Sequence, residues 1–205
     1  RDPEMSRGLG DVYKRQNRGC HDAIKELYKR LNNTKICYIV DADIKGFFDH
    51  MKHEWIIKFL YLYIKDPNII GLVKKYLKVG VIDGGELMMN EEGSAQGNII
   101  SPILANIYMH NVLTLWYKFI ITKECKGDNF LIVYADDFVA GFQYKWEAEN
   151  YYKLLKERME KFGLQLEESK SRLLQSGAYI ARAKQKSGES TRLETFDFLG
   201  FTLSL

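Results

Sequence analysis

The chain has 205 residues, of which 46% are hydrophobic and 13% aromatic, enough to bury the core of a single domain. Its net charge of +3 is too small to identify a nucleic-acid-binding surface by itself, and its three scattered cysteines argue against a disulfide framework. No apolar run reaches the roughly 18 residues of a membrane helix and no signal peptide is visible, which predicts a soluble, cytoplasmic protein with no membrane partner.

The first residues show no regular hydrophobic period. Residues 1–16 combine glycine, proline and charged side chains, so we interpret them as a loose tail, with a non-native origin as one explanation. We assign residues 17–205 to one domain. Its first helix is expected at residues 22–31, where apolar side chains recur at helical spacing.

A near-continuous apolar strand is expected at residues 35–44, and it carries Asp41 and Asp43 near its end. These two carboxylates are two residues apart, so they share a face if the strand persists. For Asp41, a solvated strand end and a functional role are both open. For Asp49, just beyond, a helix N-cap is a better explanation than metal binding, because aspartate is a preferred N-cap residue.

The middle of the chain predicts two helices, a short hairpin and a longer helix, at residues 52–64, 69–79, 80–89 and 101–121. Ser101 is expected to cap the longer helix, with Pro102 at its first position. His50 and His53 are three residues apart, but no second pair of metal ligands accompanies them. We therefore interpret both as surface histidines and not as a zinc site.

The most informative stretch is Tyr134-Ala135-Asp136-Asp137, which interrupts an apolar run between residues 130 and 142. β-Branched and aromatic residues on both sides of an acidic break predict a hairpin with the two aspartates at its tip. Adjacent carboxylates repel each other, and a divalent cation would offset that cost, although aspartate also suits an ordinary turn. Together with the acidic end of the 35–44 strand, this hairpin could hold two Mg²⁺ ions ~4 Å apart, an arrangement used for phosphoryl displacement.

After the hairpin, residues 144–162 predict a helix that ends at Gly163, and the polar residues 181–192 predict a mobile loop. Strand, helix, hairpin, helix and strand in this order predict an α+β fold, with a ferredoxin-like antiparallel sheet backed by helices. Basic residues cluster in three places, which are either solvated faces or contacts to phosphate backbones. The clusters are Lys25, Lys29 and Arg30, then Lys74, Lys75 and Lys78, then Arg182, Lys184 and Lys186.

Five segments, in chain order, resemble the motifs of reverse transcriptases, and most closely the type encoded by bacterial group II introns. They are Asp41-Ala42-Asp43-Ile44-Lys45-Gly46-Phe47-Phe48-Asp49, Gly93-Ser94-Ala95-Gln96-Gly97-Asn98-Ile99-Ile100-Ser101-Pro102, Tyr134-Ala135-Asp136-Asp137, Phe162-Gly163-Leu164 through Lys170, and Phe196-Asp197-Phe198-Leu199-Gly200-Phe201. The resemblance covers residues 19–201. Each motif alone is moderately specific, and the shared order of all five carries the assignment.

The resemblance implies an RNA-directed DNA polymerase that transfers a nucleotide from a dNTP to a primer 3′-hydroxyl, with two Mg²⁺ ions for which Mn²⁺ could substitute. The implied metal ligands are Asp43, Asp136 and Asp137, of which Asp43 and Asp136 are expected to bind most directly. Lys170 would act near the leaving pyrophosphate, as counter-charge or proton donor. The residues implied for nucleotide binding are Phe48, Gln96 and Gly97, with Phe48 sensing the sugar, and those for primer contact are Phe198, Leu199 and Gly200.

The expected partners are an RNA template, a DNA or RNA primer, dNTPs and intron RNA, whereas the sequence gives no oligomeric state. Ala95 stands where the family usually has proline before the glutamine, and Asn98 stands where it has a second glycine. These departures put the stiffness of the loop around Gln96 in question. The resemblance starts in the middle of a motif and stops before a helical thumb. We therefore expect a polymerase palm with part of the fingers, which extends a primer barely or not at all in isolation.

Three of these residue assignments compete with purely structural roles. Phe48 could be an ordinary core residue, Lys170 a surface lysine, and residues 198–201 a packed edge hairpin. The element could instead be a retron, a diversity-generating or a defence-associated reverse transcriptase. A third possibility is an RNA-binding splicing helper, or maturase, that uses the fold without synthesis.

Overall fold

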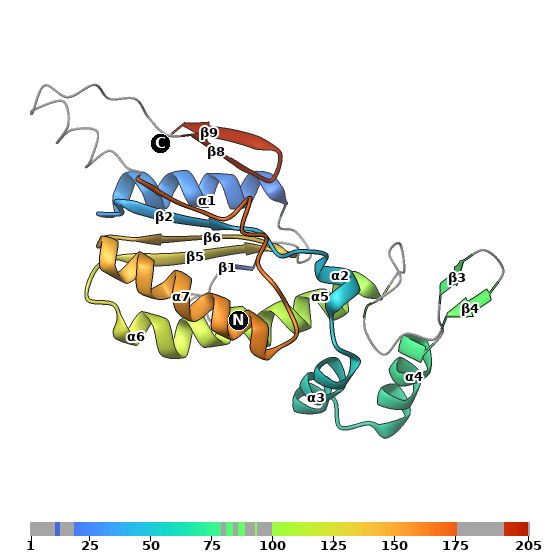
Figure 1. Ribbon diagram of the computed structural model, residues 1–205. Helices are drawn as coiled ribbons and strands as arrows, with labels where there is room; N and C mark the ends of the chain where they lie inside the picture. The colour runs from blue at the N-terminus through green and yellow to red at the C-terminus, as the bar shows by residue number, and fades with distance from the viewer. Residues whose placement is uncertain are drawn as a thin grey trace, which may run out of the picture.

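The computed structural model describes residues 11–12, 19–78, 81–83, 86–88, 93, 100–175 and 195–204, which form an α+β fold (Figure 1). The helices and strands, in chain order, are β1 (Asp11–Val12), α1 (Cys20–Asn33), β2 (Tyr38–Ala42), α2 (Phe47–His50), α3 (His53–Tyr63), α4 (Pro67–Lys78), β3 (Val81–Asp83), β4 (Glu86–Met88), α5 (Ser101–Met109), η2 (His110–Thr114), η3 (Tyr117–Ile121), α6 (Thr122–Glu124), β5 (Asn129–Tyr134), β6 (Asp137–Phe142), α7 (Lys145–Lys161), β7 (Arg172–Gln175), β8 (Thr195–Phe198) and β9 (Phe201–Ser204).

The central sheet has the strand order β1-β5-β6-β2-β7. Strands β5, β6, β2 and β7 are antiparallel neighbours, and the two-residue β1 runs parallel to β5 at the edge. In β2, Asp41 lies opposite Val139 of β6 and Arg172 of β7. Opposed residues of an antiparallel pair point to the same face, so these three side chains share one side of the sheet.

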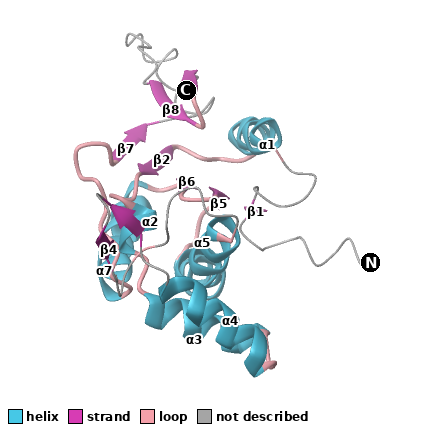
Figure 2. Ribbon diagram, turned by 90° about the vertical axis from the view of Figure 1, so that its right-hand side faces the viewer, coloured by secondary structure: helices cyan, strands magenta, loops and turns pink. Residues whose placement is uncertain are grey.

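The two faces of the sheet are covered by different elements, as Figures 1 and 2 show. The first face, which carries Asp41, packs against α1 and the β8–β9 hairpin. Its buried core is Ala23, Leu27, Ile36, Ile39, Phe130, Ile132, Val139, Leu174, Phe196, Phe198 and Leu203. The second face packs against α7 and the α5–α6 helix through a larger core that includes Val40, Ala42, Leu131, Ala140, Phe142, Tyr108, Tyr151, Leu155 and Met159. Hydrophobic burial on both faces fixes the sheet, so its ends are rigid places for functional side chains.

The helix predicted at residues 101–121 runs from Ser101 to Glu124 and contains two π-helical turns, η2 and η3. The predicted cap is off by one residue, because Ile100 holds the N-cap position and Ser101 is already helical. In a π-helical turn, some backbone carbonyl groups lack a partner within the helix and need a hydrogen-bond donor from another segment. Arg158 of α7 supplies donors here, from Nε to the Val112 carbonyl at 2.9 Å and from Nη2 to the Asn111 carbonyl at 3.3 Å.

The helices predicted at residues 22–31, 52–64, 69–79 and 144–162 and the hairpin at 80–89 are confirmed, with ends shifted by a few residues. The predicted strand at 35–44 is shorter, since β2 ends at Ala42. The N-cap interpretation of Asp49 is wrong: Gly46 caps α2, Asp49 lies inside that helix, and Lys52 precedes α3. Residues 11–12 of the predicted tail join the sheet. The rest of that tail and the predicted loop at 181–192 lie outside the described residues.

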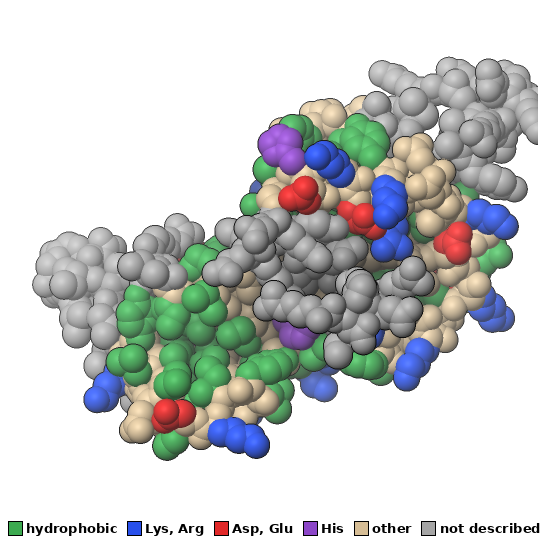
Figure 3. All heavy atoms as spheres, turned by 180° about the vertical axis from the view of Figure 1, so that it is seen from behind, with side chains coloured by type: hydrophobic (Ala, Val, Ile, Leu, Met, Phe, Trp, Pro, Cys, Tyr) green, Lys and Arg blue, Asp and Glu red, His purple; other side chains and the backbone are tan. Residues whose placement is uncertain are grey.

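Exposed apolar side chains gather at the α3–α4 end of the molecule, where Figure 3 shows a hydrophobic patch. Large exposed residues there include Tyr61, Leu62 and Tyr63 of α3 and Ile69 and Leu72 of α4. Contiguous patches of this kind mark contact surfaces for another chain or domain. Within the described part of the chain, no helix has the length and apolar character needed to cross a membrane.

Gly141 in β6 allows Phe130 of β5 to lie flat across the sheet. The two residues are paired, and a Cβ at position 141 would stand 2.3 Å from Phe130 Cε1. We expect Gly141→Ala to push the ring out of its packed position and lower the free energy of unfolding by about 1–3 kcal/mol. Urea unfolding followed by circular dichroism measures this change.

Gly71→Ala in α4 is the matched control for Gly141→Ala. A Cβ at position 71 would meet nothing within 4 Å. This substitution should therefore raise stability by up to about 1 kcal/mol, because alanine favours a helix over glycine. Equal effects of the two substitutions would contradict the close packing of Phe130 on Gly141.

Candidate functional site

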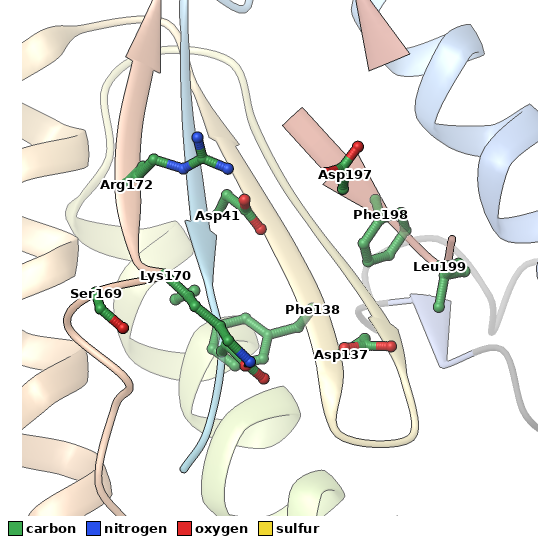
Figure 4. Close-up of a pocket in the computed structure, with 11 residues that line it drawn as sticks. Asp41, Asp137, Phe138, Ser169, Lys170, Arg172, Asp197, Phe198 and Leu199 are labelled. Carbon is green, nitrogen blue, oxygen red and sulfur yellow. The ribbon is translucent and has the colours of Figure 1, made fainter. Parts of the chain in front are cut away.

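A pocket of about 430 Å³ opens at the end of the sheet where β2 stops and the β5–β6 hairpin turns (Figure 4). Its lining comes from β2 and the residue after it, from the start of β6, from the segment leading into β7, and from the β8–β9 hairpin. The lining residues are Asp41, Ala42, Asp43, Asp137, Phe138, Ser169, Lys170, Arg172, Asp197, Phe198 and Leu199. Four carboxylates and two basic groups thus surround one cavity.

Asp43 is held at the mouth of this pocket by the segment that precedes β7. The Asp43 carbonyl accepts a hydrogen bond from the Glu167 amide at 2.8 Å, and the Lys45 amide donates to the Gln165 carbonyl at 2.9 Å. This pairing brings Lys170 within reach, and its Nζ donates to Asp43 Oδ2 at 3.1 Å. The two side chains are 69% and 38% exposed, so the ion pair adds little to stability and serves mainly to place the groups.

The hairpin tip carries the two adjacent aspartates in different positions. Ala135 and Asp136 form the turn, with Ala135 at a φ of 56°, and Asp137 begins β6 opposite Tyr134. Asp137 is exposed and lines the pocket, whereas the half-buried Asp136 is not among the lining residues. The predicted hairpin with both aspartates at its tip is therefore confirmed, and Asp137 is the one that faces the cavity with Asp43.

Asp41 lies in the pocket beside the other acidic side chains and Arg172. Burial raises the pKa of its carboxyl group to about 6; Arg172 opposes this shift, and the nearby Asp43, Asp137 and Asp197 add to it. Figure 4 shows Arg172 and Asp41 extending over the same face of the sheet from neighbouring strands. The sequence leaves the role of Asp41 open and does not single out Arg172 or Asp197. Only the two-residue spacing of Asp41 and Asp43 points to their shared face.

The donor set suits a hard divalent cation. Hard cations take oxygen ligands, and the mutual repulsion of these carboxylates is relieved by positive charge. Among the described residues, no three His, Cys, Asp or Glu side chains are close enough together to form a complete metal cage. That arrangement is compatible with Mg²⁺, which is usually held by one or two carboxylates together with water and substrate phosphates.

The other residues expected at the site are distributed around this pocket. Phe198 is buried against the first face of the sheet and, with Leu199, forms one wall, and Gly200 follows in the turn with a φ of 78°. Phe48 is half-buried in α2 and packs against the larger core, with its ring edge-on to Phe47 at 5.3 Å. Gln96 and Gly97 lie outside the described residues, as do Arg182, Lys184 and Lys186 of the third basic cluster.

Members of the first two basic clusters contact neighbouring side chains. In α1, Arg30 Nε contacts Glu26 at 2.7 Å and Lys29 Nζ lies 3.8 Å from the same carboxylate, as expected for a solvated helix face. Lys74 Nζ lies over the ring of Tyr61, 5.6 Å from its centroid.

Comparison with known proteins gives a family match over almost the whole chain. A family model described as reverse transcriptase (RNA-dependent DNA polymerase) matches residues 12–203. The group II intron-encoded protein LtrA of Lactococcus lactis subsp. cremoris is 35% identical over 114 residues, which cover 56% of this chain and 18% of LtrA. The putative COX1/OXI3 intron 1 protein of Saccharomyces cerevisiae is 37% identical over 114 residues, covering 55% of this chain and 13% of that protein. The chain thus spans less than a fifth of the length of these relatives.

Solved structures give a similar fold at low sequence identity. Telomerase from Candida albicans, in complex with a TWJ fragment of telomeric RNA, superposes with a TM-score of 0.67 at 14% identity and covers 95% of this chain and 33% of that chain. Apo telomerase from Candida tropicalis, truncated from its C-terminal domain, gives a TM-score of 0.65 at 16% identity, with 95% and 39% covered. At this identity the likeness concerns the fold alone.

Proposed function

Because the chain belongs to the reverse transcriptase (RNA-dependent DNA polymerase) family, we propose that residues 17–205 form the palm, with part of the fingers, of an RNA-directed DNA polymerase from a group II intron retroelement. The observation that carries this proposal is the pocket in which Asp43, Asp137 and Lys170 meet beside the β8–β9 hairpin. The antiparallel order β5-β6-β2-β7, with α5–α6 and α7 as crossovers, supports a ferredoxin-like polymerase palm.

The side chains in and near the pocket have different proposed roles in nucleotidyl transfer. Asp43, Asp136 and Asp137 would hold divalent cations, preferably Mg²⁺, and those cations supply charge neutralisation at the reacting phosphate and activation of the primer hydroxyl. Lys170, already within 3.1 Å of Asp43, is placed to donate a proton or positive charge to the departing pyrophosphate. The β8–β9 turn at Leu199 and Gly200 is proposed to hold the primer end next to these groups. Orientation of reactants in this way is the main catalytic contribution of the protein.

An RNA template and a DNA or RNA primer are the proposed partners, with dNTPs as substrates and intron RNA as a further ligand. A splicing helper without synthesis would not need an acidic pocket, and the retention of Asp43, Asp136 and Asp137 favours a polymerase over it. The similarity to LtrA favours a group II intron over a retron or a defence-associated element.

Primer extension on an RNA template tests the proposed function. Two proteins are compared: the chain of residues 1–205, and the same chain joined to the flanking segments of LtrA, called here the LtrA-extended chain. We expect the LtrA-extended chain to extend a DNA primer with dNTPs in Mg²⁺ and to stop when the metal is chelated. Residues 1–205 alone should extend it far more slowly, because part of the grip on the duplex comes from flanking segments. Metal-independent extension, or none by a folded LtrA-extended chain, would overturn the proposal.

Phe48 is proposed to exclude ribonucleotides through the bulk of its ring. Phe48→Val should open space beside the ribose and raise ribonucleotide incorporation relative to deoxyribonucleotide incorporation by about tenfold, the factor that corresponds to about 1.4 kcal/mol of discrimination. The ratio of kcat/KM for each dNTP and its rNTP measures this effect in the LtrA-extended chain. Because Phe48 also packs against the core, thermal unfolding is measured alongside. A lower melting temperature with an unchanged ratio would assign Phe48 to packing alone.

A further inference from the structure

Gly93 lies directly on the backbone of α2, at the corner between α2 and α3. Its amide donates to the Met51 carbonyl at 2.8 Å, and its φ of 89° is a conformation that glycine adopts readily. A Cβ at this position would stand 3.0 Å from the Asp49 carbonyl oxygen and 3.3 Å from the Phe48 carbonyl oxygen. Only a residue without a side chain can approach the Phe48–Asp49 backbone so closely.

His53, the first residue of α3, holds Gly93 from the other side. Its Nε2 lies 2.6 Å from the Gly93 carbonyl oxygen. A carbonyl oxygen only accepts hydrogen bonds, so Nε2 must carry the proton and donate it. His53 is half-buried, so its expected place at the surface stands, but the sequence does not predict its hydrogen bond to a residue 40 positions away.

The surface beneath Gly93 is rigid. Phe47, the first residue of α2, is 2% exposed and packs edge-on against Tyr108 of α5 at 6.2 Å. Phe48 leans on Phe47 from the same helix. Gly93 is thus joined by one hydrogen bond to Met51, at the C-cap of α2, and by another to His53, at the start of α3. The core holds α2 in place, and Phe48 belongs to that helix.

We propose that His53 and Gly93 form a clamp that positions the incoming nucleotide. Gly93 opens the segment that resembles the nucleotide-binding motif, and Gln96 follows three residues later in the sequence. Fixing Gly93 on α2 sets the start of that segment relative to Phe48, which is proposed to contact the sugar. This inference rests on the proposed function, and it makes His53 a positioning residue that acts through Gly93 without touching the nucleotide.

Steady-state kinetics of the LtrA-extended chain test the nucleotide part of the inference. His53→Ala should raise KM for dNTP about tenfold, the effect of one lost hydrogen bond, while kcat and the affinity for primer–template duplex change less than about twofold. His53→Gln should restore most of the affinity, because its amide N–H stands the same number of bonds from Cβ as Nε2–H of histidine. Gly93→Ala should raise KM at least as much as His53→Ala. Lys58→Ala, at an exposed position of the same helix, should leave KM unchanged.

Hydrogen exchange on residues 1–205 tests the clamp itself and needs no polymerase activity. In His53→Ala, the Gly93 amide, which donates to the Met51 carbonyl, should exchange at least about tenfold faster, while amides in the central sheet keep their rates. An unchanged Gly93 rate would overturn the clamp. A faster Gly93 rate combined with an unaltered KM in an active protein would overturn its role in nucleotide positioning. A folded but inactive LtrA-extended chain would instead overturn the proposed function, and the nucleotide role with it.

Discussion

Replacing Asp136 with asparagine should reduce primer extension by the LtrA-extended chain about a thousandfold or more. Asparagine keeps the size of the side chain but removes the charge that would hold a divalent cation. A cation at the reacting phosphate is worth several kcal/mol in such reactions, and about 4 kcal/mol corresponds to a thousandfold in rate. Single-turnover primer extension, with saturating dNTP and Mg²⁺, measures this loss.

The same experiment distinguishes the three aspartates. Asp43→Asn should slow primer extension as much as Asp136→Asn does, because Asp43 is also a proposed direct ligand of the cation. Asp137→Asn should slow primer extension less than Asp136→Asn if Asp137 only adds negative charge and does not bind the cation. Asp137, however, lines the pocket with Asp43, whereas Asp136 does not. A larger loss for Asp137→Asn than for Asp136→Asn would show that the cation binds on the pocket side of the hairpin.

A structural control separates lost metal binding from lost folding. Asp66→Asn, in the loop before α4, leaves an oxygen that can accept the Asn68 amide as Asp66 does at 2.8 Å, so activity and stability should stay at the parental level. Binding of Mn²⁺ to residues 1–205, followed by water-proton relaxation, gives a second readout. Parental rates for Asp136→Asn, or undiminished Mn²⁺ affinity in all three variants, would rule out this metal site.

The sequence predicts local features of this protein well and long-range contacts poorly. The β5–β6 hairpin depends on neighbouring residues, so the pattern around Tyr134-Ala135-Asp136-Asp137 predicts it directly. By contrast, the ion pair between Lys170 and Asp43 joins residues 127 positions apart. Only the resemblance to reverse transcriptases suggests that these two residues belong to one site.

Local patterns place the starts of helices only approximately. Asp49 is predicted as an N-cap, but α2 already begins at Phe47 after Gly46, so Asp49 lies inside that helix. Ser101 is predicted as the cap of the longer helix, and Ile100 holds that position instead. The hydrogen bond of His53 to Gly93, 40 positions away, has no signal in the local pattern. No sequence signal marks Arg158 either, because the π-helical carbonyls that it binds cannot be seen in a hydrophobic pattern.

The largest effect on stability is expected at Glu147, in the first turn of α7. Glu147 is only 2% exposed. Its Oε1 accepts hydrogen bonds from the backbone amides of Lys126 at 2.6 Å and of Gly127 at 3.1 Å. These two amides belong to the connection between α6 and β5. Glu147→Ala would remove the acceptor of these two part-buried hydrogen bonds, and a hydrogen bond to a charged group contributes about 1.5–3 kcal/mol. We therefore expect a loss of about 2–4 kcal/mol in the free energy of unfolding, measured by urea denaturation.

Glu149→Ala, two residues further along α7, is the matched control. Glu149 is exposed and its carboxylate lies 3.3 Å from Lys145 Nζ, so its removal should cost less than about 0.5 kcal/mol. Glu147→Gln keeps an oxygen acceptor for the two amides. Its free energy of unfolding should therefore lie between those of Glu147→Ala and Glu149→Ala.

The thiol of Cys125 reports on the same buried carboxylate by an independent route. Burial raises the pKa of Cys125, and Glu147 and Glu124 raise it further, to about 12. Since the thiolate is the reactive form, Cys125 should be alkylated slowly by iodoacetamide at pH 8 and faster in Glu147→Gln, which removes one of the two negative charges. Equal stability of Glu147→Ala and Glu149→Ala, together with an unchanged alkylation rate at Cys125, would show that Glu147 does not hold the α6–β5 connection.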